Sequence, residues 1–233
     1  MDIWLQRTVA LLGQDAVSIL QSSHIAIFGL GGVGSFAAEA LARCGVGTIT
    51  LIDADIISES NINRQLFALQ STVGHLKTEA AAERIKDINP KCIVHVISEF
   101  YSEENSKDFF HAKYDFCVDA IDTVSSKISL IKECKERNIP IISCMGTGNK
   151  LHAELLQIGR LSKTNTCPLC RVMRRELKNR NLGDIYVVWS QEEPATIVAE
   201  DANGRHAPAS VAFVPPVAGF LLAEHVVLQL TEK

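Results

Sequence analysis

The stretch at residues 28–45, FGLGGVGSFAAEALARCG, decides the fold. An apolar segment typical of a buried strand, residues 24–30, leads into it, and an alanine-rich segment typical of a helix, residues 33–44, follows the glycines. The glycines that fit the spacing G-x-G-x-x-G are Gly29, Gly31 and Gly34, with Gly32 between them. Such a turn lets the backbone approach a phosphate closely and lets the helix pack tightly. The stretch therefore predicts a nucleotide-binding α/β fold.

Strand-like and helix-like segments alternate through the first two thirds of the chain. The further strands expected are 47–53, 92–98, 114–122 and 139–145, and the further helices are 76–88 and 124–137. Continuous apolar strands between helices are typical of a mostly parallel sheet that helices cover on both faces.

The pattern changes after residue 151. An antiparallel strand is expected at 151–159, another strand at 184–190, and a closing helix that begins at its prolines at 214–230. We therefore predict a Rossmann-like, doubly wound α/β fold whose mostly parallel sheet carries C-terminal antiparallel strands and a closing helix. The expected organisation is a single domain, 1–233, with an N-terminal helical arm, 1–22, and a basic lid, 160–183.

Composition and charge limit the function classes. The 233 residues are 47% hydrophobic and 21% charged, as in an ordinary soluble enzyme, and the net charge of −4 argues against nonspecific coating of nucleic acid. We expect no membrane partner, because no apolar run reaches about 18 residues and the N-terminus lacks the features of a secretory signal. Most of the seven cysteines lie in predicted strands or helices, so a reducing, cytoplasmic location is expected.

Asp53 ends the second predicted strand, 19 residues after Gly34. A carboxylate in that place accepts hydrogen bonds from ribose hydroxyls. Together with the glycine turn it predicts an adenine nucleotide, against the alternative of a glycine turn without a ligand. These two features do not separate NAD from ATP.

Charged residues crowd the segments that follow, DADIISESNINRQLF and VGHLK. Their cations, Arg64 and Lys77, suit an enzyme that splits the α–β phosphate bond of ATP, because fixed cations stabilise the charge that develops on the phosphorus oxygens and on pyrophosphate. Asp119 and Asp122 end a later strand on the same edge of the sheet, where a carboxylate can hold Mg²⁺. Each residue alone fits a solvated loop, but their joint placement favours a site.

The motifs GLGGVG, LIDADIISESNINRQ, VGHLK and DAID resemble the adenylating domain of the ubiquitin-activating superfamily, which includes the HesA, MoeB and ThiF adenylyltransferases. The resemblance implies that Asp53 holds the ribose, that the phosphates bind Asn61, Arg64 and Lys77, and that Asp122 binds Mg²⁺ through ATP. The catalytic residues that it implies are Arg7, Arg64, Lys77 and Asp122. The implied nucleotide-binding set is Gly29, Gly31, Gly32, Gly34, Asp53, Asp55, Asn61, Arg64, Gln65, Lys77 and Asp122.

The resemblance also implies a homodimer. The family donates an N-terminal arginine across the dimer interface, and Arg7, six residues before Gly13, matches it. Whether a monovalent cation, Na⁺ or K⁺, and sulfur-transfer proteins also bind stays open.

Within the superfamily, the motifs NINRQ, DAIDT, PIISCMGTGNK, CPLCRVMRREL and FVPPVAGF resemble the tRNA threonylcarbamoyladenosine dehydratases. Members of that family adenylate the carboxylate of threonylcarbamoyladenosine in tRNA, and the modification's own carbamoyl group then closes a ring with net loss of water. Because this chemistry is intramolecular, no protein nucleophile is required. The alternatives are activation of the C-terminus of a small ubiquitin-like sulfur carrier, and a nucleotide-dependent oxidoreductase or binding module.

Cys167 and Cys170 form a single Cys-x-x-Cys pair. Sulfur-carrier activators commonly have two such pairs, which together bind zinc. Two ligands do not close a structural zinc site, so no zinc is expected, with a site shared across a dimer axis as the alternative. The missing pair favours the tRNA enzyme.

The segment 160–183 carries seven basic residues and one acidic residue, a net charge of +6 in a chain whose net charge is −4. Its apolar residues fall on one helical face, which would turn the arginines outward. A solvated amphipathic helix is the alternative, but a tRNA substrate favours an RNA-facing element, because phosphate contacts need clustered Lys and Arg. The residues of the apolar face are Leu169, Val172, Met173 and Leu177, and the central arginines are Arg171, Arg174 and Arg175.

Overall fold

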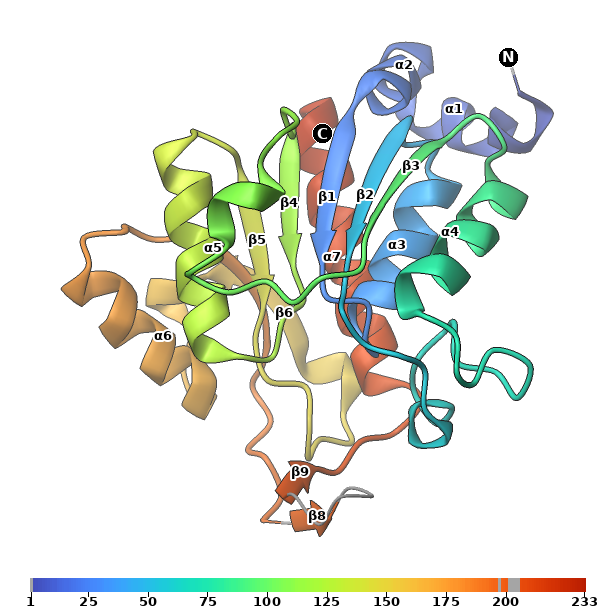
Figure 1. Ribbon diagram of the computed structural model, residues 1–233. Coiled ribbons are helices and arrows are strands. Elements are labelled where there is room, and N and C mark those ends of the chain that lie inside the picture. The colour runs from blue at the N-terminus through green and yellow to red at the C-terminus, as the bar shows by residue number, and fades with distance from the viewer. Residues whose placement is uncertain (1, 197, 201–205) are drawn as a thin grey trace.

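A computed structural model describes residues 2–196, 198–200 and 206–233 of the protein (Figure 1). A seven-stranded sheet in the order β3-β2-β1-β4-β5-β7-β6 forms its centre. All neighbouring strands are parallel except β6 and β7, which are antiparallel. The strands are β1 (His24–Phe28), β2 (Thr48–Ile52), β3 (Ile93–Ile97), β4 (Phe116–Asp119), β5 (Ile141–Cys144), β6 (Leu156–Arg160) and β7 (Tyr186–Ser190). The predicted doubly wound α/β fold is confirmed.

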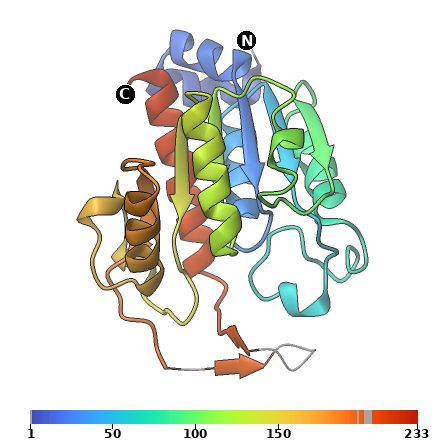
Figure 2. The same ribbon diagram turned by 60° about the vertical axis from the view of Figure 1, so that its left-hand side comes forward.

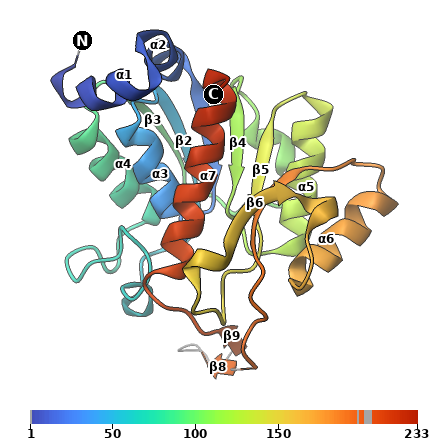
Figure 3. The same cartoon turned by 180° about the vertical axis from the view of Figure 1, so that it is seen from behind.

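Helices cover both faces of the sheet. On one face lie α3 (Gly34–Arg43), α4 (Lys77–Ile88) and α7 (Val214–Thr231), and on the other lie α5 (Val124–Glu136) and α6 (Pro168–Asn179) (Figures 1 and 3). The apolar strand residues alternate between the two faces, so two buried clusters form, one on each side. The central strands are therefore fully buried, as their continuous apolar runs predict.

The glycine turn is packed against its surroundings. Gly29 has φ +90°, and a Cβ atom there would lie 2.7 Å from the carbonyl oxygen of Ala120. A Cβ atom on Gly34 would overlap the carbonyl group of Gly29, and one on Gly219 would lie 2.9 Å from the Cβ atom of Phe36. Glycine at these three positions lets β1 approach the loop after β4, and lets α3 approach β1 and α7.

The N-terminal arm forms α1 (Gln6–Leu12) and α2 (Gln14–Ser22), at the opposite end of the sheet from the carboxyl ends of the parallel strands (Figure 1). Leu5, in a short 3-10 turn before α1, is 1% exposed. The arm also leaves apolar side chains on the surface: Ile3, Trp4, Leu11 and Ile19.

Some sequence-based expectations differ from the structure. The strand at 114–122 ends at Asp119, and the strand at 151–159 begins only at Leu156. Because β3 is an edge strand with a single neighbour, Ile93 and Val96 are exposed rather than buried. The short pair β8 (Val198–Glu200) and β9 (His206–Pro208), below the main sheet in Figure 2, lies in a region for which no strand was predicted.

We expected no segment that is long and apolar enough to span a membrane, but by length and composition alone α7 meets that description. However, 61% of this helix is buried inside the protein. It lies beside α3 on one face of the sheet and packs against both α3 and the strands, so its apolar character belongs to the core.

Candidate active site

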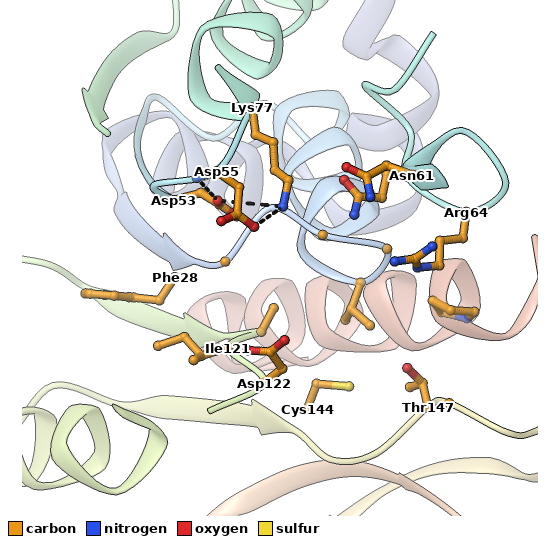
Figure 4. A pocket seen from close by; sticks show the side chains of 18 of the residues that line it. Phe28, Asp53, Asp55, Asn61, Arg64, Lys77, Ile121, Asp122, Cys144 and Thr147 are labelled. Carbon is orange, nitrogen blue, oxygen red and sulfur yellow. Dashed lines mark hydrogen bonds and ion pairs between the residues drawn. The ribbon is translucent and has the colours of Figure 1, made fainter. Parts of the chain in front are cut away.

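A cleft of about 640 Å³ opens at the carboxyl ends of β1, β2, β4 and β5 (Figure 4). The chain crosses from one half of the sheet to the other between β3 and β4, so β1 and β4 flank the topological switch point. Open α/β sheets bind their ligands there. Almost all of the site residues expected from the sequence line this one cleft.

The glycine turn forms the floor of the cleft, where Gly31 and Gly32 line it. A Cβ atom on Gly31 would meet nothing closer than 3.9 Å, so its open side faces the cleft. On Gly32 the Cβ atom would lie 3.1 Å from Pro215, which forms the neighbouring wall. The turn thus offers bare backbone to a phosphate.

Asp53 lies at the end of β2 and reaches back to the glycine turn. Its carboxylate accepts hydrogen bonds from the backbone N–H groups of Leu30, at 2.7 Å, and Asp55, at 2.8 Å. Burial raises the pKa of Asp53, while the nearby Lys77 ammonium and the two N–H groups oppose that rise. Each carboxylate oxygen retains a lone pair with which it can accept from a hydroxyl.

Lys77 begins α4 and points toward two carboxylates (Figure 4). Its ammonium is 2.6 Å from the carboxylate of Asp55 and 3.8 Å from that of Asp53. The backbone N–H of Lys77 also donates to the carbonyl oxygen of Asp55, which holds the two residues side by side.

Arg64 and Asn61 reach the cleft from the loop between β2 and α4. The Arg64 guanidinium donates to the Ser60 carbonyl at 3.0 Å and to the Asn63 side chain at 2.8 Å, and burial lowers its pKa. Asn61 accepts from the backbone N–H of Ser58, which shapes the loop. Gln65 is buried beneath the glycine turn and also lines the cleft.

Asp122 lines the cleft on the side opposite to these cations (Figure 4). Its carboxylate is exposed and accepts a hydrogen bond from the Thr123 hydroxyl at 3.3 Å. Asp119, which the sequence placed on the same edge, does not reach the cleft. It is fully buried and forms an ion pair with Lys127.

Arg7 stands apart from the other expected residues. It is exposed on α1, at the far end of the sheet, and it does not line the cleft of its own chain.

Three later segments complete the cleft and were not expected from the sequence. The first follows β3, the second runs from the end of β5 into the loop after it, and the third runs from the end of β9 to the first turn of α7. Their position just after β3 and β5 was the available signal, since every strand that ends at this edge can contribute its next residues. They line the cleft with Glu99, Phe100 and Tyr101, with Cys144, Met145, Gly146, Thr147 and Gly148, and with Pro208, Ser210 and Pro215.

Cys167 and Cys170 are buried at the start of α6, behind the wall of the cleft. The Cys170 thiol, together with backbone N–H groups of Cys170, Gly146 and Leu169, lowers the pKa of Cys167 to about 5. Within residues 2–196, 198–200 and 206–233, no group of three or more metal-ligating side chains is found.

The basic segment forms α6, whose apolar side chains Met173 and Leu177 are buried as predicted. Arg171 and Arg175 are exposed. The expectation that Arg174 points outward was wrong, because its guanidinium donates to the carbonyl oxygen of Thr164 at 2.9 Å and to the hydroxyl of the same residue.

Comparison with known proteins gives the following similarities. The model of the ThiF family matches residues 5–233. The tRNA threonylcarbamoyladenosine dehydratase of Bacillus subtilis (strain 168) is 43% identical over 96% of this chain and 93% of its own length. A solved structure of the E. coli tRNA N6-threonylcarbamoyladenosine dehydratase TcdA in complex with ATP is 35% identical, with a TM-score of 0.90 over 100% of this chain and 96% of that one. The molybdopterin-synthase adenylyltransferase of E. coli (strain K12) is 34% identical, over 56% of this chain.

Proposed function

This chain belongs to the ThiF family, and we propose that it is an ATP-dependent dehydratase that acts on threonylcarbamoyladenosine in tRNA. One observation carries the proposal: the glycine turn, the Asp53 carboxylate at the end of β2, two cations and an opposing carboxylate line a single cleft. Two dehydratases are 43% and 35% identical to this chain over 96% and 100% of its length, whereas the molybdopterin-synthase adenylyltransferase matches 56% of it.

The proposed reaction has two steps. A carboxylate oxygen of the threonyl group attacks the α-phosphorus of ATP, and the bond to pyrophosphate breaks. The carbamoyl group of the same nucleoside then attacks the acyl carbon, AMP leaves and the ring closes. The protein supplies position and charge stabilisation, and no side chain needs to form a covalent bond.

The residues have distinct proposed roles. Asp53 accepts from the ribose hydroxyls, the bare backbone of Gly31 and Gly32 meets the phosphates, and Lys77 and Arg64 stabilise the charge on departing pyrophosphate. Lys77 must exchange its contact with Asp55 for a phosphate contact, which the exposure of Asp55 permits.

Asp122 is the proposed ligand for Mg²⁺. Its exposed carboxylate faces the cleft and accepts a hydrogen bond from the Thr123 hydroxyl, and a hard oxygen donor suits this ion. When bound with ATP, Mg²⁺ would neutralise part of the charge on the phosphates.

Two further proposals concern partners. Arg7 lies far from its own cleft, so a role in phosphate binding requires a second copy of the chain that donates it, as in a homodimer. Helix α6 contributes Leu169 to the wall of the cleft. We propose that the exposed basic residues of this helix contact tRNA phosphates.

The test is mass analysis of nucleosides from tRNA that contains threonylcarbamoyladenosine, after incubation with this protein, ATP and Mg²⁺. We expect the modified nucleoside to lose one molecule of water and AMP to form in equal amount. A parallel reaction with a ubiquitin-like carrier protein in place of tRNA tests the alternative. AMP release with the carrier and an unchanged nucleoside mass would reject the proposal.

A further inference from the structure

The loop between β4 and α5 is held by a buried ion pair that takes no direct part in the cleft. The Lys127 ammonium lies 2.9 Å from the Asp119 carboxylate, and both side chains are 0% exposed. Asp119 also accepts a hydrogen bond from the Ser143 hydroxyl on β5. The pair therefore joins the end of β4, the adjacent strand and the first turn of α5.

Between the two charged residues, the backbone of Ile121 is fixed at both of its polar groups. Its N–H donates to the Asp119 carboxylate at 3.1 Å, and its carbonyl oxygen accepts from the Lys127 ammonium at 2.9 Å. Since these two contacts determine where the peptide units on either side of Ile121 point, they set the position of the following residue, Asp122.

The same loop forms a wall shared by the two halves of the site. The Ala120 carbonyl packs against Gly29 of the glycine turn, and Ile121 and Asp122 line the cleft (Figure 4). A shift of this loop would therefore move Asp122 relative to the turn that faces the phosphates.

Stability alone does not account for the ion pair. Burying two charges carries a large desolvation cost, and apolar side chains of similar volume often serve a fold as well or better. In this protein the Lys127 ammonium also donates a hydrogen bond to the backbone carbonyl of Ile121, in the wall of the cleft.

We propose that Lys127 is a positioning residue for the adenylation step, which fixes Asp122 at the cleft through Asp119 and the Ile121 backbone. The inference rests on the proposed adenylating function. It assigns Lys127 no contact with substrate, since Lys127 does not line the cleft.

The test is a double-mutant cycle between the ion pair and Asp122. The pair variant Asp119→Asn/Lys127→Met removes both charges and leaves neither buried and unpaired. It is combined with Asp122→Asn, and kcat, KM for ATP and Tm are measured for each protein. We expect the pair variant to fold, to keep KM within about threefold and to lose about 100-fold in kcat, as a misplaced group does.

The variant that combines all three substitutions decides whether the ion pair acts on kcat through Asp122. If it does, adding Asp122→Asn to the pair variant reduces kcat no further than the larger of the two separate losses, because the effects of interacting residues are not additive. Multiplied losses, or a pair variant with native kcat, would overturn the inference. If the native protein itself forms no AMP with tRNA, the proposed function fails instead.

Two further variants keep the test sharp. Ser106→Ala/Glu133→Gln breaks another buried contact of α5, a 2.9 Å hydrogen bond, and should leave kcat native. Should the pair variant fail to fold, Ser143→Ala removes one donor to Asp119 without stranding a charge. Ser143→Ala should cause a smaller loss in kcat than the pair variant, and it should cause no loss when it is added to Asp122→Asn. If Ser143→Ala reduces kcat equally with and without Asp122→Asn, the inference is overturned.

Discussion

The Lys77 ammonium lies 2.6 Å from the Asp55 carboxylate, although the Lys77 side chain is 7% exposed and that of Asp55 is 67% exposed. A buried cation is therefore paired with an anion that stands largely in water, so solvent weakens the pair. Phosphate oxygens that enter the cleft can compete for this ammonium. The arrangement suits a residue whose charge is needed during the reaction rather than for the fold.

Lys77→Ala should reduce turnover by about 10²–10³ and leave most of the affinity for ATP, because its charge acts chiefly as pyrophosphate leaves. Turnover is measured as AMP formation and affinity by calorimetry. Lys86→Ala, an exposed lysine on the same helix, is the matched control and should behave as the native protein. Equal losses in affinity and turnover would assign Lys77 to ground-state binding.

The glycine turn allows a test that separates fold from binding. Gly31→Ala should fold normally, since its Cβ atom would meet nothing closer than 3.9 Å, yet bind ATP at least about tenfold more weakly because the methyl group occupies the phosphate side. Gly34→Ala should lose about 1–3 kcal/mol of stability, because its Cβ atom overlaps the carbonyl group of Gly29. Thermal denaturation and ATP titration distinguish the two. Native ATP affinity in Gly31→Ala would place the phosphates elsewhere.

The site residues that could be predicted from the sequence are those whose positions follow from short-range spacing or from a short motif. The glycine turn and Asp53 follow from a spacing within one strand–helix–strand unit, and Lys77 follows from its motif. Burial of the Lys127 ammonium against Asp119 was not predictable in this way, because a lysine in a helix is ordinarily solvated. Thr147 likewise joins the cleft only because β5 lies beside β4, and the order of strands is a property of the whole sheet.

The wrong expectation for Arg174 on α6 has the same cause, since a local pattern does not report contacts between separate segments. Periodicity correctly placed Met173 and Leu177 on the buried face, but it treated every arginine as outward-facing. Arg174 instead reaches back to Thr164, ten residues earlier, where a turn presents a carbonyl group. Such contacts depend on where the preceding loop runs, which no helical period reports.

The stability of the protein should fall on mild acidification because of His225. Burial, with a smaller effect from Arg160, lowers the pKa of His225 below its ordinary value of 6.5. The unfolded chain therefore binds the proton more readily, so this contribution to stability is present above pH 6.5 and is lost as the pH falls below it. His225→Gln should show a smaller fall in Tm between about pH 7.5 and about pH 5.5 than the native protein. The control variant His152→Gln, at an exposed histidine, should show the same fall in Tm as the native protein. Equal falls in Tm in the native protein and in both variants would contradict the assignment to His225.

Charge reversal on α6 tests the RNA-facing surface. Arg171→Glu/Arg175→Glu should weaken tRNA binding and flatten its salt dependence, because fewer phosphates are neutralised, and should leave ATP affinity unchanged. Binding is measured by filter retention at several salt concentrations. Lys107→Glu/Lys113→Glu makes the same change of charge at two exposed lysines beyond β3 and serves as the control. A native salt slope in the α6 variant would place the tRNA on another surface.

Arg7 is expected to act in the cleft of a second copy of the chain. It lies at the far end of its own sheet, and the arm that carries it also exposes Ile3 and Leu11, 80% and 85% exposed, which a partner could cover. Arg7→Ala and Asp122→Ala should each lose most activity as pure proteins. Mixed and allowed to exchange subunits, they should regain up to about a quarter of native activity, since half of the dimers are then mixed and each has one intact site. Native mass spectrometry, with one variant isotopically labelled, establishes that the mixed dimers form. If they form and the mixture stays inactive, Arg7 does not act across the interface.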